Sequence, residues 1–180
     1  MKLKKNKKAR PSENVNESRL RCEIEDCSYR KVEKHMITEL QQKIIDAFLE
    51  RKTPVYDFIY FYGNLEQIAA ILDTAEEKYR ARYPEARVIR TDPEAFRADT
   101  IHCILNGKRP VRECDLLIFE NIGEIAGLEA NEERLYYLLD WLLLNHRQAI
   151  ISGEVPATQL FLIHERIRAQ IEGGISVPVE

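Results

Sequence analysis

The sequence predicts a three-layer α/β domain with a five-stranded parallel sheet, preceded by an amphipathic helix. Five short apolar runs lack the polar–apolar alternation that marks a half-buried strand. Longer stretches separate these runs, and in them apolar residues recur every three or four positions, as on one face of a helix. Strands that are apolar on both faces and joined by helical crossovers form parallel sheets covered by helices on each side.

The N-terminal part of the chain divides into a tail and a helix. Residues 1–28 are polar and are predicted to form a mostly disordered tail. Residues 30–52 are predicted to form the helix, since their apolar members share one face: Val32, Met36, Ile37, Leu40, Ile44, Ile45, Phe48 and Leu49. The helix should end before Pro54, because a residue that precedes proline avoids the helical conformation. The domain is therefore expected at 29–180, with its α/β core at 55–180.

The first half of this core alternates strands with helices. A β-branched and aromatic run predicts a strand at 55–62, and a second, shorter strand is predicted at 86–90. The helix between them, at 65–83, has an apolar side made of Ile68, Ala69, Ile71, Leu72, Ala75 and Tyr79. Asp92 is a typical N-cap and is followed by a proline, so the next helix should begin there and end at Asn106-Gly107.

The second half continues the alternation. Residues 115–119 are predicted to form a strand that is apolar on both faces, followed by a leucine-rich helix at 129–145. A further strand is predicted at 148–152, and one or two helical segments at 156–170. The last short strand is predicted at 175–179.

Composition excludes several classes of protein. Hydrophobic residues make up 44% and charged residues 32% of the 180 positions, which excludes a mainly disordered chain. No apolar run approaches the ~18 residues of a membrane span, and the basic N-terminus lacks the apolar core of a signal peptide. Four scattered cysteines do not make a disulfide scaffold. We therefore expect a cytoplasmic protein with reduced thiols and no membrane contact.

The charge is unevenly distributed along the chain. The overall charge is −3, but residues 1–12 contain no acid and six cations: Lys2, Lys4, Lys5, Lys7, Lys8 and Arg10. A basic tail on an acidic body suits contact with the phosphates of DNA, and the alternative is a solubilising tail. Cys22, Cys27 and His35 lack an evident fourth zinc ligand, so we expect free thiols there and no metal.

The carboxyl ends of the strands are the expected ligand edge of such a sheet. After the first strand, a nucleotide hydrolase would carry a glycine-rich phosphate loop with a lysine and a hydroxyl. This turn instead contains Gly63 and Asn64, a predicted helix cap, followed by Glu66, whose charge opposes phosphate. An anion of small size is therefore a better fit than a triphosphate.

The ends of two other strands carry acids. Glu120 follows four apolar residues, as does the magnesium-binding carboxylate of a Walker B strand, and Asn121 stands where a second acid would help to activate water. Glu154 follows the fourth strand. The alternative for Glu120 is a solvated acid at a strand–helix turn.

Five segments, in order, resemble the AAA+ domain of the bacterial replication initiator DnaA and its relatives, the DnaC/IstB helicase loaders. They are Phe58–Leu65, Phe96–Lys108, Asp115–Gly127, Ile150–Pro156 and Glu165–Gly174. They resemble, respectively, the first strand with its phosphate loop, the F-x9-N-G-K helix, the Walker B segment, the sensor 1 strand and the box VII run. The resemblance implies a P-loop NTPase fold and a role in DNA replication.

The departures from that family fall mostly at one site. In the register of the resemblance, Glu66 replaces the last glycine of the loop, Gln67 its lysine and Ile68 its hydroxyl. Asn121 replaces an acid and Gln170 the arginine finger, whereas Arg166 and the sensor 1 acid, Glu154, remain. We expect neither the family's helical lid nor its helix-turn-helix domain in this chain. The vestigial nucleotide site would comprise Gly63, Asn64, Gln67, Glu120, Asn121, Glu154 and Arg166.

The resemblance therefore implies a DnaA-like protein that acts by binding and has lost ATP hydrolysis. Expected partners are replication initiator or helicase proteins and DNA, in homo- or hetero-oligomers, with no cofactor. Lys108 and Arg109 belong to a basic cluster that lies, in the resembled family, near the surface for single-stranded DNA; the alternative is a solvated surface. A nucleotide-binding ATPase with an irregular loop and an interaction scaffold unrelated to replication are the alternative functions.

Overall fold

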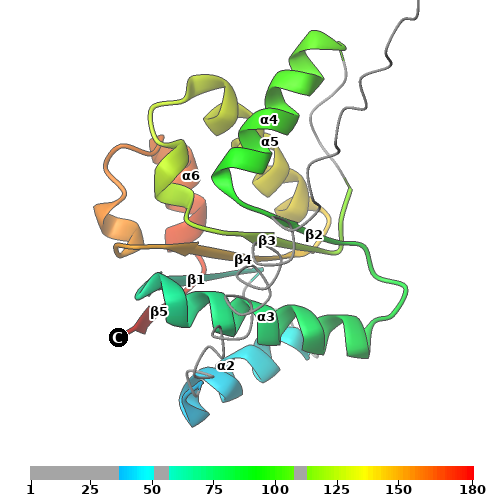
Figure 1. Cartoon of the computed structure of the whole chain (residues 1–180), viewed down its shortest axis with the longest axis vertical. Helices are drawn as coiled ribbons and strands as arrows, with labels where there is room; N and C mark the ends of the chain where they lie inside the picture. Colours follow the sequence, from blue (N-terminus) through cyan, green and yellow to red (C-terminus); the bar gives the residue numbers. More distant parts are fainter. Residues whose placement is uncertain (1–36, 51–56, 108–112) are drawn as a thin grey trace, which may run out of the picture. The chain divides into compact units, whose positions relative to one another are not determined.

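The computed structural model describes residues 37–50, 57–107 and 113–180, and contains the predicted parallel sheet (Figure 1). The strands are β1 (Phe58–Gly63), β2 (Val88–Thr91), β3 (Leu116–Phe119), β4 (Gln148–Gly153) and β5 (Ile175–Val179). Their order is β2-β3-β4-β1-β5, and every neighbouring pair is parallel. The prediction of five strands in a parallel α/β sheet is confirmed.

Helices cover both faces of the sheet and connect its strands. The helices are α2 (Glu39–Leu49), α3 (Leu65–Arg82), α4 (Pro93–Leu105), α5 (Glu129–Leu144) and α6 (Glu165–Glu172), with short 3₁₀ helices at Ile122–Ile125 and Ala157–Gln159. Figure 1 shows α2 and α3 on one face and α4, α5 and α6 on the other. This arrangement gives the three predicted layers.

Two apolar cores explain why the strands lack polar alternation. Alternate residues of β1 enter different cores: Phe58 and Tyr60 pack toward α4, α5 and α6, whereas Ile59 and Phe61 pack toward α2 and α3. All four side chains are at most 2% exposed. A strand that buries both faces needs apolar residues at every position, which is the pattern in the sequence.

Capping side chains fix the starts of two helices as predicted. Asn64 accepts hydrogen bonds from the backbone N–H groups of Glu66 and Gln67, and Asp92 accepts one from that of Ala95. The described strands and helices after α2 begin and end close to their predicted positions. Residues 156–170, predicted as one or two helical segments, contain a 3₁₀ helix and the start of α6.

The prediction of a single helix at 30–52 is wrong where the structure first describes this range, because residues 37 and 38 are not helical. Thr38 is extended (φ −62°, ψ 151°), and α2 begins at the next residue. Thr38 and Gln41 form a capping box, in which each side chain bonds the other's backbone N–H, so the helix is terminated locally. Leu40, predicted on the apolar face, is 68% exposed, and Gln41 is buried instead. Residues 1–36 and 51–56, and with them the predicted tail, lie outside the described residues.

The described cysteines belong to the core. Cys103 and Cys114 are free and buried. Burial raises the pKa of the Cys114 thiol to about 11, although Arg87 and Arg147 act in the opposite direction. The described residues contain no group of three or more metal-ligating side chains, and none of their helices is long and apolar enough to cross a bilayer. Cys22, Cys27 and His35 lie outside them.

A buried arginine joins α5 to α4. Arg134 is 5% exposed, and its guanidinium donates to the backbone oxygen of Phe96 (3.2 Å) and to the hydroxyl of Thr100 (2.8 Å), and pairs with Asp99. It also lies 4.5 Å from the centre of the Phe96 ring. These contacts satisfy a charge that would otherwise be costly to bury.

We expect Arg134→Ala to lower the free energy of unfolding by about 3 kcal/mol, because it leaves Asp99 and Thr100 without this partner. Urea denaturation measures the loss. Lys43→Ala, which removes an exposed ion pair with Glu39, is the control and should change stability by less than about 0.5 kcal/mol. Equal effects of the two substitutions would contradict the assignment of Arg134 as a buried link.

Candidate functional site

The polar residues predicted at the strand ends lie at one edge of the sheet. β4 stands between β3 and β1, with Phe119 opposite Ile151 and Tyr62 opposite Gly153. The backbone N–H of Asn121, just after β3, donates to the hydroxyl of Ser152 on β4 (3.0 Å). The carboxyl ends of the three strands are therefore adjacent, as expected for a ligand edge.

The connection from β1 to α3 is a single residue. Gly63 still belongs to β1 and pairs with Val179 of β5, and the N–H of Asn64 donates to the Val179 carbonyl oxygen (3.0 Å). α3 begins at Leu65. A phosphate loop needs several residues outside strand and helix, whose N–H groups point at the ligand. In this chain, nearly all the residues at the position of such a loop belong to β1 or to α3.

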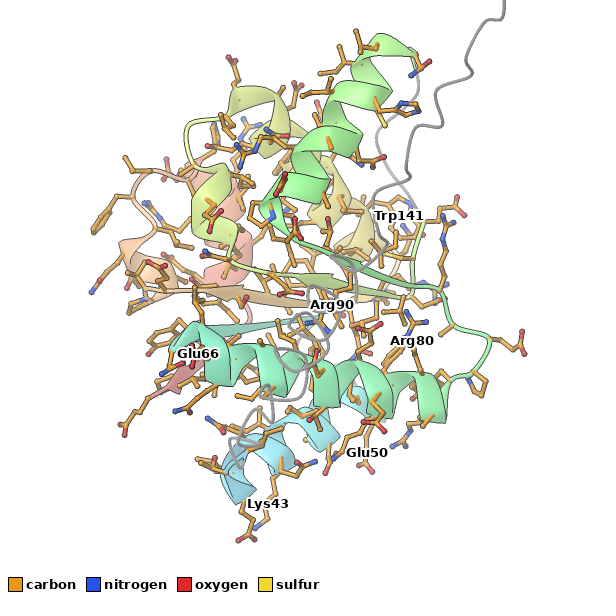
Figure 2. All side chains as sticks on the ribbon, in the orientation of Figure 1. Lys43, Glu50, Glu66, Arg80, Arg90 and Trp141 are labelled. Atoms are coloured by element: carbon orange, nitrogen blue, oxygen red, sulfur yellow. The ribbon has the colours of Figure 1, made fainter. Side chains whose placement is uncertain are left out.

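Three N–H groups in the first turn of α3 are satisfied within the chain. The side-chain oxygen of Asn64 accepts from Glu66 (3.0 Å) and Gln67 (3.2 Å), and its backbone oxygen accepts from Ile68 (2.9 Å). Figure 2 shows Glu66 at this end of α3, where its negative charge opposes anion binding. The start of α3 therefore has fewer free N–H groups for binding an anion than a helix N-terminus usually provides.

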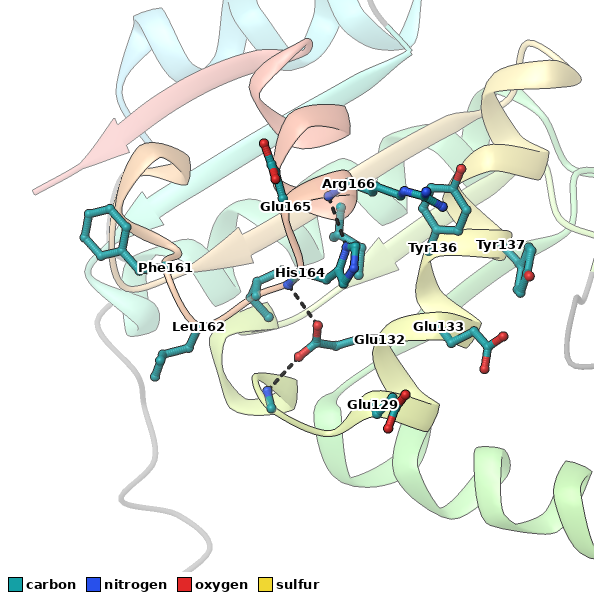
Figure 3. Close-up of a pocket in the computed structure, with 13 residues that line it drawn as sticks. Glu129, Glu132, Glu133, Tyr136, Tyr137, Phe161, Leu162, His164, Glu165 and Arg166 are labelled. Carbon is teal, nitrogen blue, oxygen red and sulfur yellow. Dashed lines mark hydrogen bonds between the residues drawn. The ribbon is translucent and has the colours of Figure 1, made fainter.

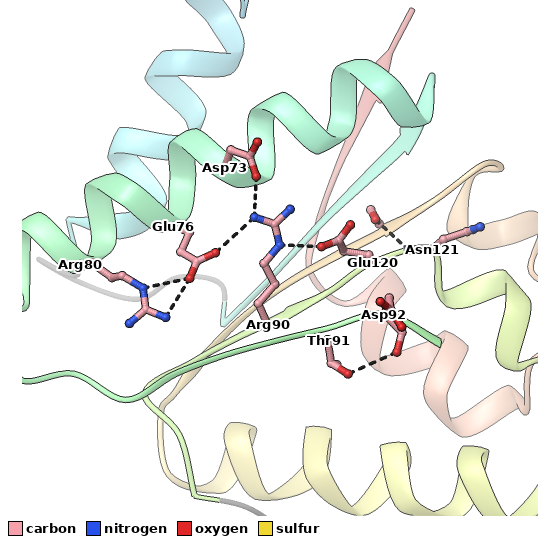
Figure 4. A network of polar contacts seen from close by, with 9 residues as sticks. Asp73, Glu76, Arg80, Arg90, Thr91, Asp92, Glu120 and Asn121 are labelled. Atoms are coloured by element: carbon pink, nitrogen blue, oxygen red, sulfur yellow. Dashed lines mark hydrogen bonds and ion pairs between the residues drawn. The ribbon is translucent and has the colours of Figure 1, made fainter. Parts of the chain in front are cut away.

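An arginine holds the acid at the end of β3. Arg90 of β2 donates from Nε to the Glu120 carboxylate (2.5 Å), and its Nη1 contacts Asp73 (2.6 Å) and Glu76 (3.2 Å) on α3 (Figure 4). Arg80 also pairs with Glu76 (2.8 Å). Glu120 is thus part of an ion-pair network between the sheet and α3, instead of a solvated acid.

The network keeps Arg90 charged. Partial burial alone lowers the pKa of a guanidinium, but the hydrogen bonds to Glu120, Asp73 and Glu76 outweigh it and raise the pKa of Arg90 above its ordinary value. An arginine is protonated at any pH that the fold tolerates. Its positive charge next to Glu120 is therefore permanent.

The remaining predicted site residues occupy different places. Asn121 adopts the left-handed conformation (φ 43°), and its side chain donates to Glu124 (2.6 Å). Glu154 is exposed after β4. Arg166 lies on α6, with its guanidinium 5.8 Å from the centre of the Tyr136 ring of α5. Lys108, Arg109 and the six basic residues of 1–12 lie outside the described residues.

Arg90 is the residue whose role the sequence analysis did not find. In the sequence, Arg90 is one of six basic residues between Arg87 and Arg112. A signal was present, because Arg90 pairs in register with Ile118 of β3, and Glu120 follows two residues later on the same face. That register becomes available only once β2 and β3 are known to be neighbours.

A cleft of about 740 Å³ lies between α5 and the segment that leads into α6 (Figure 3). The buried carboxylate of Glu132 holds its wall together by accepting hydrogen bonds from the N–H groups of Gly127 (2.6 Å) and His164 (2.8 Å). Three large side chains of its lining are exposed: Tyr137 (48%), Phe161 (74%) and Leu162 (79%). The lining also includes the exposed acids Glu129, Glu133 and Glu165.

Comparison with known proteins places this fold in a family. Residues 37–178 match the model of the bacterial DnaA ATPase domain. The chain belongs to this family. A DnaA chromosomal replication initiator from Deinococcus deserti is 27% identical over 140 residues, covering 74% of this chain, and one from Herpetosiphon aurantiacus is 26% identical over 140 residues. The match covers 31% and 30% of these relatives, so the chain spans about a third of their length.

Solved structures of the DnaA family and of a helicase loader share the fold. AMPPCP-bound DnaA from Aquifex aeolicus superposes with a TM-score of 0.70 at 19% identity, over 81% of this chain and 48% of that one. The DnaC helicase loader superposes with a TM-score of 0.65 at 12% identity, over 82% of this chain and 95% of that one. The family's three-layer core is therefore retained here.

The single-residue connection after β1 makes Gly63 a sensitive position. Its φ of +124° is one that L-residues rarely adopt, and an added Cβ would overlap the carbonyl oxygen of Val179. We expect Gly63→Ala to cost at least about 2 kcal/mol of stability, measured by thermal or urea unfolding.

Gly107→Ala is the matched control. Gly107 also has a positive φ (+59°), but nothing lies within 4 Å of its added Cβ. This substitution should cost only about 1 kcal/mol, from backbone strain alone. If both variants lost the same stability, the close packing of β1 against β5 at Gly63 would be refuted.

Proposed function

We propose that this DnaA-family chain acts in the initiation of DNA replication, or in its regulation, by binding other proteins and without hydrolysing ATP. The observation that carries the proposal is the connection from β1 to α3, which is reduced to Asn64. A triphosphate needs a cradle of free N–H groups at this place, and the first turn of α3 directs two of its N–H groups at the Asn64 side chain.

Other residues of the edge support the loss of hydrolysis. Glu120, at the magnesium-binding position of the resemblance, contacts Arg90. Gln67 and Gln170 stand where the resemblance expects the lysine and the arginine finger. An arginine finger alone contributes about 10³–10⁵ in rate, so several losses together leave no useful turnover. The residues of this chain do not fit magnesium–ATP, and we derive no step through it.

The surface that we assign to the protein partner is the cleft between α5 and α6. Phe161 and Leu162 expose most of their apolar surface there, and Glu129, Glu133 and Glu165 add negative charge. Apolar anchors surrounded by charge favour a complementary partner segment. We therefore propose as occupant a segment of a replication initiator or helicase protein that carries apolar side chains flanked by Lys or Arg.

A second candidate is a nucleotide-binding protein with an irregular phosphate loop. The observation that favours it is the shared fold with an AMPPCP-bound DnaA. The two candidates differ in one measurable property, the affinity for magnesium–ATP. Contact between residues 1–12 and DNA is a separate proposal, which either candidate accommodates.

We expect no heat of binding and no thermal shift when the purified chain is titrated with millimolar magnesium–ATP, since the phosphate cradle is missing. Isothermal calorimetry is the measurement. Affinity tighter than about 10 µM, roughly −7 kcal/mol, would reject the proposed function in favour of the nucleotide-binding candidate. Glu120→Gln and Glu154→Gln would then be assayed for hydrolysis.

We expect Leu162→Asp to weaken binding to a purified DnaA-type initiator or replicative helicase by at least about tenfold, because it places a charge in the apolar part of the cleft. Biosensor titration measures the affinity. Leu144→Asp is the matched control, since Leu144 is 74% exposed on α5 and is not part of the cleft lining. Equal losses for both variants, or no binding by the unaltered chain, would refute the assigned surface.

A further inference from the structure

Strand β2 forms one edge of the sheet and has β3 as its only neighbouring strand in the described part of the chain. All residues of β2 are half-buried, whereas those of β3 are buried throughout. An edge strand presents a row of N–H and carbonyl groups that no strand pairs with. These groups are a template on which a further strand can add to the sheet.

The hydrogen bonds to β3 show which backbone groups of β2 point outward. The carbonyl oxygens of Arg87 and Thr91 accept hydrogen bonds from N–H groups at the start of β3 and just after its end (3.4 and 3.0 Å). The odd-numbered residues of this segment therefore face β3, since the backbone groups of successive residues in a strand point to opposite sides. The N–H and carbonyl groups of Val88 and Arg90 point away from the sheet.

The opposite edge of the sheet, β5, is protected against such pairing. The carbonyl oxygen of Val179 accepts from the N–H of Asn64 next to β1, so Val179 faces β1 and the preceding Pro178 faces outward. Proline has no N–H donor, and natural sheets use it on edge strands to prevent further pairing. β2 contains no proline, and the guanidinium of its one charged residue, Arg90, is bound by acids of the same chain. Of the two edges, β2 is thus the one suited to receive another strand.

A pocket of about 210 Å³ lies beside β2, between the sheet, α4 and α5. Its apolar lining includes Ile89 of β2, Phe96 of α4 and Leu138 of α5, and two of its charged residues, Asp99 and Arg134, pair with each other. Ile89 packs on this face of the sheet. An apolar side chain that an added strand directs to the same face would therefore find apolar contacts next to Ile89.

Strand β2 is complementary to a second copy of itself. In an antiparallel pair with its two-fold axis at Ile89, this residue stands opposite its counterpart, and Val88 stands opposite Arg90 of the other copy. The outward groups of Val88 and Arg90 then exchange both hydrogen bonds of each such pair. The two Ile89 side chains meet on the face that contains the pocket, so each copy supplies an apolar side chain next to the pocket of the other. An axis at Arg90 would instead place two like charges directly opposite each other, which is unfavourable.

We propose that two copies of this chain associate through β2, antiparallel about Ile89, so that their sheets become one continuous sheet. The interface is isologous, because the same strand serves both copies. It goes beyond the proposed function and does not depend on it, since the lining of the cleft between α5 and α6 contains no residue of β2.

Sedimentation equilibrium of the full chain, from micromolar to millimolar concentration, is the test, and we expect a monomer–dimer equilibrium. Val88→Pro should weaken dimerisation by at least about tenfold, because it removes an outward N–H and leaves the bonds of its neighbours to β3 in place. Ser176→Pro is the matched control. Ser176 is exposed on β5 and points outward, like Pro178 two residues later, so its substitution should leave dimerisation unchanged.

Three results would overturn the proposal: a chain that stays monomeric, a dimer that is unaffected by folded Val88→Pro, or equal weakening by the two proline substitutions. A monomeric chain whose affinity for a purified DnaA-type initiator falls with Val88→Pro would assign this edge to that partner and would reject a second copy as its occupant.

A cross-linking measurement covers the case in which Val88→Pro does not fold. Opposite residues of a non-hydrogen-bonded antiparallel pair have Cα atoms about 4.5 Å apart, within the range of a disulfide. Ile89→Cys should therefore form a covalent dimer with oxidised glutathione, and peptide mass spectrometry should locate the bond at position 89 of both copies. Thr91→Cys is the control, because in this register position 91 stands opposite Arg87 of the other copy. Folded Ile89→Cys that does not cross-link at position 89, or equal cross-linking by Thr91→Cys, would contradict the proposed interface.

Discussion

The pairing of β1 with β5 continues to the last residue of both strands, and the ligand edge of the sheet depends on it. Gly63 lies so close to Val179 that no side chain fits at this position. The next N–H group, that of Asn64, still donates to a carbonyl oxygen of β5. Because the backbone is held in the sheet this far, only one residue remains before α3. The geometry after β1 is therefore set by strand pairing and by a helix cap.

Charge balance at the same edge follows from a second set of contacts. Parallel pairing of β2 with β3 places Arg90 next to Glu120, and the packing of α3 on that face brings two more carboxylates to the guanidinium. In the proposed function this arrangement replaces metal and nucleotide by internal contacts. The fold stays that of the DnaA family, while the chemistry that the fold supports is determined by a few side chains.

The proposed binding surface lies on the opposite side of the sheet. Glu132 accepts hydrogen bonds from two backbone N–H groups and so joins the two sides of the wall of the cleft between α5 and α6. A preorganised surface loses less conformational freedom on binding than a loop that must order first. The cleft and the Arg90 network lie on opposite faces of the same sheet.

The sequence by itself determined the fold class, the helix caps at Asn64 and Asp92, and the absence of phosphate-loop residues. Caps are hydrogen bonds between residues close in the sequence, and strands buried on both faces are apolar at consecutive positions, so both can be recognised from short segments. It did not predict that α2 begins only after Thr38, or that Leu40 faces solvent, because the predicted apolar stripe ran through the capping box. Only the tertiary structure decided the partners of Arg90. Glu120 is 30 residues away, and which strands are neighbours, in which register, depends on packing of the whole sheet.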